Sequence, residues 1–311
     1  MEATTPIRGI ESRLRVTEGR VAAANGLRIR ERWVDVASPP VRVRVLESGS
    51  GDPVMFINGI SAPGIGMAPL AGRLPGHRHL LIDLPGHGLS PPYHWQGAPL
   101  REQAVNVIAG VVDGLDIDQV TLVGNSLGGL FSLWFALDRP SRVARAVIVG
   151  QPAVAIQGSR GSPMMGVLTA PVLGRVATWT ARLPAPRFSS RLALRDGSGA
   201  HAARLVSNDI VDLHALPMRL PGQATSFRSL QKRLLVGRTA RPENVLTDAE
   251  LRNFTVPLLF VWPDDDRFLA PAAGKPSVDK IPSARFVTMP GGHFPWYDDP
   301  DQCAALVAQG L

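Results

Sequence analysis

One pentapeptide constrains this chain more than any other segment: Gly124-Asn125-Ser126-Leu127-Gly128. An apolar run at residues 120–123 precedes it, and an apolar helical pattern follows at 129–137. The pattern G-x-S-x-G between a strand and a helix predicts a tight turn that projects the serine hydroxyl from the backbone. Only small residues fit two positions either side of that serine, and the helix N-terminus behind it favours developing negative charge. The alternative interpretation is an ordinary strand-to-helix turn with a capping serine.

A serine nucleophile needs a base and a group that orients the base, and both follow it in the sequence. A buried strand pattern at residues 256–262 leads into three consecutive acids, Asp264, Asp265 and Asp266. A second strand pattern, at 284–289, leads into Gly291-Gly292-His293, where the glycines let the loop fold back over the sheet edge. The chain therefore offers all three residue types of a Ser-Asp-His triad.

These motifs, in this order, resemble the α/β-hydrolase family from about residue 28 to the C-terminus, including its D-x-x-G-x-G-x-S turn at residues 83–90. The resemblance implies the α/β-hydrolase fold, a mostly parallel sheet with helices on both faces and a helical lid insertion. Asn125-Ser126 and the run Asp-Asp-Arg-Phe at 265–268 further resemble the meta-cleavage-product (carbon–carbon bond) hydrolases. Asn58-Gly59-Ile60 is similar to a segment of the polyhydroxyalkanoate depolymerase-like branch.

The register of the resemblance selects the acid. Family strands in this place typically end W-G-x-x-D-x-x-x-P, and matching Trp262, with Pro263 in place of the glycine, gives Asp266 as the triad acid. Asp265 is the second choice and Asp264 the third. The two acids outside the triad are expected to be part of a solvated loop.

The resemblance also implies an oxyanion hole made of backbone N–H groups, from Leu127 and from Ile60. The family usually has His-Gly where this chain has Asn58-Gly59. Asn58 either hydrogen-bonds only within its loop or contacts the substrate. The candidate substrate-binding residues are Asn58, Asn125, Met164 and Trp296.

Composition limits the class of protein. The chain has 311 residues, of which 45% are hydrophobic, enough for one α/β domain with an insertion. No stretch approaches the ~18 apolar residues of a transmembrane helix, and the charged first 20 residues (Glu2 among them) lack the apolar core of a secretory signal. The single cysteine, Cys303, excludes an intramolecular disulfide. We therefore predict a cytoplasmic enzyme, monomeric or homodimeric.

No metal-ligand spacing and no dinucleotide-binding glycine motif occurs in the chain, so we predict chemistry without a metal or cofactor. The alternation of strand and helix patterns divides it into three parts. An N-terminal extension covers residues 1–27, the α/β-hydrolase core covers 28–151 and 255–311, and a helical lid covers 152–254. The core is expected to begin with a hairpin, residues 29–36 and 41–46, whereas strand patterns vanish within the lid.

The predicted lid is much more basic than the core. Residues 153–253 contain 14 Lys and Arg against 6 Asp and Glu, a net +8, and subtraction from 33 and 26 leaves the rest with 19 and 20, a net −1. Its arginines are interleaved with apolar residues, as in amphipathic helices with a solvated basic face. The other interpretations are a site for a substrate carboxylate, an acyl-carrier partner or an anionic membrane surface. No recognition motif accompanies the charge, so nucleic acid is not an expected partner.

We predict a serine hydrolase that cleaves the carboxylic ester (or thioester) of a small-molecule substrate, apolar or anionic, through an acyl-enzyme. Ser126 attacks the carbonyl, His293 takes its proton, and Asp266 holds the imidazole. The alternative is a carbon–carbon bond hydrolase of the meta-cleavage-product type, which in that branch goes with a lid arginine that binds a carboxylate. A further alternative is a non-catalytic ligand-binding protein on the same fold.

Overall fold

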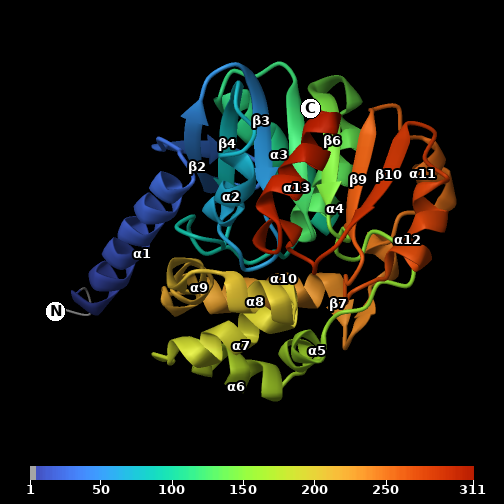
Figure 1. Ribbon diagram of the computed structural model, residues 1–311. Helices are drawn as coiled ribbons and strands as arrows, with labels where there is room; N and C mark the ends of the chain where they lie inside the picture. Colours follow the sequence, from blue (N-terminus) through green and yellow to red (C-terminus); the bar gives the residue numbers. More distant parts are fainter. Residues whose placement is uncertain (1–4) are drawn as a thin grey trace.

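The computed structural model describes residues 5–311, so Glu2 and the other residues before Thr5 lie outside the described chain. An eight-stranded sheet forms its centre, with strand order β1-β2-β4-β3-β5-β6-β9-β10 (Figure 1). β1 and β2 pair antiparallel, β2 pairs antiparallel with β4, and the remaining pairs are parallel. This arrangement confirms the mostly parallel α/β-hydrolase sheet and the hairpin at its start.

The carboxyl ends of all strands except the antiparallel β2 lie at one edge of the sheet. The strands comprise β1 (Arg30–Val36), β2 (Val41–Gly49), β3 (Asp52–Ile57), β4 (His77–Asp83), β5 (Val120–Asn125), β6 (Val143–Val149), β9 (Leu258–Pro263) and β10 (Ala284–Met289). The loops that follow β3, β5, β6, β9 and β10 all emerge at this edge, because these strands are parallel. The predicted catalytic residues Ser126, Asp266 and His293 follow β5, β9 and β10 at this edge.

Two apolar cores form because side chains alternate across each strand. In β3, Met55 and Ile57 belong to one core, and Val54 and Phe56 belong to the other. The first core is closed by α3 (Leu100–Gly114) and α4 (Leu127–Asp138), and α12 (Pro271–Val278) also contributes to it. The second is closed by α2 (Ala68–Ala71) and α13 (Pro300–Val307). Helices therefore cover both faces, as the sequence predicts.

Between β6 and β9 the chain forms a mainly helical segment, which we call the insertion (residues 152–254). It contains α5 (Pro163–Thr169), α6 (Leu173–Thr180), α7 (Arg187–Ser198), α8 (Ala200–Leu205), α9 (Asn208–Ala215), α10 (Gln223–Leu234) and α11 (Asp248–Arg252). Figure 1 shows α5 to α10 gathered beyond the carboxyl edge of the sheet. A two-residue hairpin, β7 (Leu235–Val236) with β8 (Thr239–Ala240), corrects the expectation that the segment has no strands. Two paired residues are too few to produce a recognisable alternation.

The N-terminal extension folds as α1 (Thr5–Ala24) and is joined to the core by buried charges. Glu18 on α1 accepts two hydrogen bonds from the Arg44 guanidinium, at 2.8 and 2.7 Å, and all but 1–2% of both side chains is buried. Arg44 also donates to Asp83 at 3.0 Å. Burial alone would lower the pKa of Arg44, but its bonds to Glu18 and the charge of Asp83 raise it above its ordinary value.

Candidate active site

Ser126 lies in a strained turn between β5 and α4. Its backbone has φ 51° and ψ −114°, in the left-handed half of conformational space that non-glycine residues rarely occupy. A Cβ on Gly124 would lie 2.5 Å from the Gly128 carbonyl oxygen, and one on Gly128 would lie 1.8 Å from the Ile57 carbonyl oxygen. The two glycines are therefore required by close backbone contact, which explains the G-x-S-x-G spacing in physical terms.

His293 and Asp266 form a buried pair on neighbouring loops. The His293 Nδ1 to Asp266 Oδ2 distance is 2.8 Å, and at most 2% of either side chain is exposed. Asp266 also accepts hydrogen bonds from the backbone N–H groups of Gln151 (2.9 Å) and Phe268 (3.1 Å). The other ring nitrogen, Nε2 of His293, is buried and has no hydrogen-bond partner in residues 5–311. Asp264 and Asp265 are exposed.

Asn125 ties the serine turn to the histidine loop. Its side-chain amide donates to the carbonyl oxygens of Val149, at 2.7 Å, and of His293, at 3.0 Å. Asn125 is fully buried and does not line the pocket in front of Ser126. The structure thus gives this residue a positioning contact rather than the substrate contact suggested by the sequence.

The loop after β3 lies against Ser126. A Cβ on Gly59 would be 3.2 Å from the Ser126 Cβ. The Asn58 side chain donates to the Pro63 carbonyl oxygen (2.9 Å) and accepts from the Gly59 N–H (2.7 Å), so it holds its own loop and is not free for substrate. Leu127 begins α4, where helix geometry leaves its N–H without an intrahelical partner. Leu127 and Ile60 both line the pocket that contains Ser126.

That pocket is a cavity of about 30 Å³, room for roughly one water molecule. Its polar lining residues beside Ser126 are Gln151, Arg160 and Gln231, and the remainder is mostly apolar: Ile60, Leu127, Ala153, Val154, Gly161, Met165, Leu234, Leu235 and Phe268. Gln231 is 1% exposed, and its side-chain nitrogen has no hydrogen-bond partner in the described chain. A cavity of this size has no room for a substrate molecule as it stands.

Two other predicted substrate-binding residues lie outside this pocket. Met164 is 55% exposed on α5, and its neighbour Met165 lines the cavity instead. Trp296 is buried and donates to the Gly66 carbonyl oxygen at 3.0 Å. Sequence reasoning missed Arg160, Gln231 and Phe268, because their approach to Ser126 depends on how the insertion packs. Phe268 follows the acidic loop directly, and its ring centroid lies 4.5 Å from that of His293.

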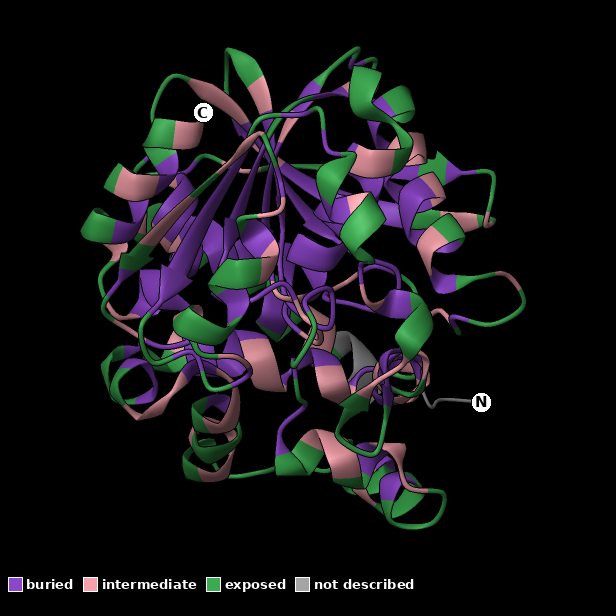
Figure 2. Cartoon of the chain, turned by 90° about the vertical axis from the view of Figure 1, so that its right-hand side faces the viewer, coloured by how far each residue is buried: buried purple, intermediate pink, exposed green. Residues whose placement is uncertain are grey.

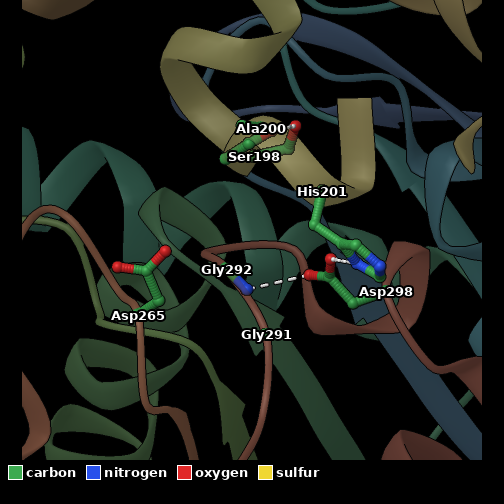
Figure 3. Close-up of a pocket in the computed structure, with 8 residues that line it drawn as sticks. Ser198, Ala200, His201, Asp265, Gly291, Gly292 and Asp298 are labelled. Carbon is green, nitrogen blue, oxygen red and sulfur yellow. Dashed lines mark hydrogen bonds and ion pairs between the residues drawn. The ribbon is translucent and has the colours of Figure 1, made fainter. Parts of the chain in front are cut away.

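A second cavity, of about 210 Å³, is lined by Gly291 and Gly292 of the histidine loop and by Asp265 and Asp298 (Figure 3). Asp298 accepts there from the Gly292 N–H and pairs with Nδ1 of His201, both at 2.8 Å. It therefore fixes the glycine turn that leads to His293. Ser126 does not line this cavity. Residues 5–311 contain no group of His, Cys, Asp and Glu suited to hold a metal ion.

The family model described as "Alpha/beta hydrolase family" matches residues 54–306. The 2-hydroxy-6-oxononadienedioate/2-hydroxy-6-oxononatrienedioate hydrolase of Cupriavidus pinatubonensis is 29% identical over 78% of this chain and 81% of its own length. The 2-hydroxy-6-oxo-2,4-heptadienoate hydrolase of Pseudomonas putida is 33% identical over 61% of this chain and 64% of its own.

Among solved structures, naproxen esterase from Bacillus subtilis has a TM-score of 0.69 and 17% identity, covering 96% of both chains. The meta-cleavage product hydrolase from Pseudomonas fluorescens has a TM-score of 0.70 and 20% identity, covering 89% of this chain and 96% of its own. These two likenesses concern the fold alone. In the described part of the chain, no helix has the length and apolar character needed to span a membrane.

Proposed function

Because the chain belongs to the alpha/beta hydrolase family, we propose that it is a serine hydrolase acting through Ser126, His293 and Asp266. The supporting observation is the buried 2.8 Å contact of His293 Nδ1 with Asp266, which leaves Nε2 without a protein partner. An imidazole held by a carboxylate in this way presents Nε2 as the proton acceptor. In the first step Ser126 Oγ attacks a substrate carbonyl carbon and His293 Nε2 takes the hydroxyl proton.

The oxyanion formed by that attack accepts hydrogen bonds from the N–H groups of Leu127 and Ile60. Neither N–H donates to another group in residues 5–311. Each such donor contributes roughly 3 kcal/mol to transition-state stabilisation, by analogy with measured losses in other hydrolases. The insertion acts as a lid, since Met165 on α5 and Gln231 on α10 line the same cavity as Ser126.

The substrate we propose is a 2-hydroxy-6-oxo dienoic acid, cleaved at a carbon–carbon bond. Curated relatives act on such compounds by name, and the residues that line the cavity include one arginine, the exposed Arg160, in an otherwise mostly apolar wall. Arg160 has no carboxylate partner in the described chain. A guanidinium binds a carboxylate with two parallel hydrogen bonds, so Arg160 can fix the acid end while the apolar wall contacts the hydrocarbon.

The reaction balances as a hydrolysis. The 2-hydroxy dienoate first takes its 2-oxo tautomer, in which the enol proton has moved to C5 and C3=C4 connects C5 to the 2-oxo group. The serine oxygen then adds to the 6-oxo carbon, and collapse of the oxyanion breaks the bond between C5 and C6. The electron pair of that bond passes into the conjugated acid fragment, which takes the proton held by His293. Water then attacks the acyl-serine, releases the second carboxylic acid and restores the Ser126 hydroxyl.

Ester cleavage, the first choice from the sequence, follows the same two half-reactions with an alkoxide as the leaving group. It requires no carboxylate on the substrate and so gives Arg160 no role. We therefore rank carbon–carbon cleavage ahead of ester cleavage, reversing the order of the sequence-based prediction. The non-catalytic alternative leaves the buried His293–Asp266 pair and the strained Ser126 without a purpose.

The test compares 2-hydroxy-6-oxo-2,4-heptadienoate with p-nitrophenyl acetate. We expect kcat/KM to be at least about 100-fold higher for the dienoate, and Ser126→Ala to lower turnover of both by at least about 10⁴-fold. Arg160→Gln should raise KM for the dienoate about tenfold, as loss of a charge-assisted hydrogen bond implies, and leave the neutral ester unaffected. Arg204→Gln, an exposed insertion arginine outside the pocket, is the matched control.

Two results would count against these proposals separately. Full turnover by Ser126→Ala would reject the serine mechanism for either substrate. Faster cleavage of the ester, together with an Arg160→Gln variant that behaves like the parent on the dienoate, would reject carbon–carbon cleavage and retain the serine mechanism.

A further inference from the structure

The exposed apolar side chains of this protein are concentrated on the insertion. Within residues 5–311, twelve large hydrophobic side chains are exposed, and ten of them lie between positions 164 and 205. We call these ten residues the apolar patch: Met164, Val167, Val172, Leu173, Val176, Trp179, Leu183, Phe188, Leu192 and Leu205. Scattered exposed apolar residues are ordinary in soluble proteins, but contiguous groups mark interaction surfaces.

The helices of the apolar patch turn large apolar side chains toward solvent and not toward the protein core. Val172, just before α6, and Val176 and Trp179 on α6 recur at helical spacing and are 54–69% exposed, whereas the buried positions are Gly174 and Thr178. On α7, Phe188 and Leu192 are 74% and 56% exposed. In Figure 1, α6 and α7 form the tier farthest from the sheet, and Figure 2 shows this end largely exposed. An outward apolar face of this kind marks a surface that a partner outside the chain covers.

The same segment is strongly cationic. Residues 153–205 contain seven arginines, no lysine and one acid, Asp196. Among the seven, only Arg187 pairs with a carboxylate in the described chain, that of Asp212. The face therefore combines exposed apolar side chains with exposed arginines, of which Arg175, Arg195 and Arg204 make no side-chain hydrogen bond or ion pair within the described chain.

We infer that the apolar patch docks this protein onto an anionic lipid bilayer. The partner must be apolar and negatively charged at once, and a bilayer with acidic headgroups supplies both. Arginine binds phosphate oxygens through two donors, and Trp and Phe suit the boundary between headgroups and acyl chains. A second copy of the chain fits less well, because a two-fold contact would bring the same cationic segment against itself. The inference does not depend on the proposed reaction.

Flotation of the full chain with vesicles tests the inference. We expect the protein to float with vesicles of phosphatidylcholine and phosphatidylglycerol at about 3:1 and about 0.05 M salt, with at least tenfold weaker binding to pure phosphatidylcholine or at about 0.5 M salt. Each basic residue near such a surface contributes about fivefold to binding. Thermal unfolding of each variant checks that it is folded.

Two double variants separate the components of the surface. Trp179→Ser with Phe188→Ser, and Arg175→Gln with Arg195→Gln, should each reduce binding to anionic vesicles at least tenfold. Val16→Ser with Val236→Ser removes the two exposed large apolar residues outside the patch and should bind like the parent. The inference is overturned by equal binding to neutral and anionic vesicles, or by patch variants that bind like the parent. It is also overturned if sedimentation shows a dimer that the Trp179 and Phe188 changes dissociate, since the face then pairs with a second copy.

Discussion

At the scale of single residues, the carboxylate of Asp266 organises the site. It receives three hydrogen bonds, from His293 Nδ1 and from the backbone N–H groups of Gln151 and Phe268, and its side chain is fully buried. Asp265, by contrast, is exposed, and its backbone N–H donates to the Gly291 carbonyl oxygen at 3.0 Å. Three donors fix the orientation of the Asp266 carboxylate, which in turn fixes the imidazole ring.

Asp266→Asn therefore should lower kcat by about 10⁴-fold with little change in KM, because an amide favours the wrong imidazole tautomer. Asp265→Asn keeps the backbone contact to Gly291 and should stay within about twofold of the parent. Steady-state kinetics of both variants on the same substrate show which of the two aspartates orients His293. If Asp265→Asn lost its activity and Asp266→Asn kept it, Asp265 would be the acid that orients His293.

At the scale of elements, α1 is part of the folded structure and not a loose extension. Glu18 on this helix pairs with the buried Arg44. Arg44 also donates hydrogen bonds to Asp83 and Glu31, at 3.0 and 2.8 Å. Asp83 in turn accepts the backbone N–H of Gly64 at 2.8 Å, so the network joins α1 to the loop after β3. Arg20 on α1 also pairs with Asp209 on α9 of the insertion.

Glu18→Ala should destabilise the protein by about 3 kcal/mol, because it removes one partner of a buried ion pair and leaves Arg44 short of negative charge. For a chain of this length that corresponds to a fall in Tm of about 5 °C. Glu11→Ala, which removes an exposed carboxylate on the same helix, is the control and should shift Tm by less than about 1 °C. Calorimetry of the two variants gives the comparison; equal shifts would mean that the buried pair adds nothing beyond a surface contact.

The elements that could be predicted from the sequence are those set by local residue patterns. The strand, the tight turn at Ser126 and the following helix were predictable because Gly124 and Gly128 are required by backbone contact within that turn and with β3. Arg160 and Gln231 were not, since their position depends on tertiary packing of the insertion. The burial of Glu18 was not predictable either, because burial of a charge by a distant arginine leaves no local pattern.

At the scale of the whole molecule, the buried His79 and His87 and the half-buried His214 make folding sensitive to acid. Burial lowers the pKa of His79 and of His87, and lowers that of His214 to about 4. His214 joins α9 to the histidine loop through Tyr297, whose hydroxyl lies 3.3 Å from its Nε2. In the unfolded chain these rings bind protons near pH 6.5, well before the folded protein does. The stabilisation that comes from keeping these histidines neutral is therefore fully present above about pH 6.5, and the free energy of unfolding declines as the pH falls toward 4.

For His214 alone the loss between pH 7.5 and 4.5 should be about 2–3 kcal/mol, since each unit of pKa difference corresponds to about 1.4 kcal/mol. Urea unfolding of the parent and of His214→Gln at both pH values measures it. The variant loses the Tyr297 contact at every pH. Its free energy of unfolding should nevertheless fall by about 2–3 kcal/mol less than the parent's between pH 7.5 and 4.5. His94→Gln, at an exposed position, should leave the parent's difference unchanged. A His214→Gln variant with the parent's full acid sensitivity would place the proton uptake on other groups.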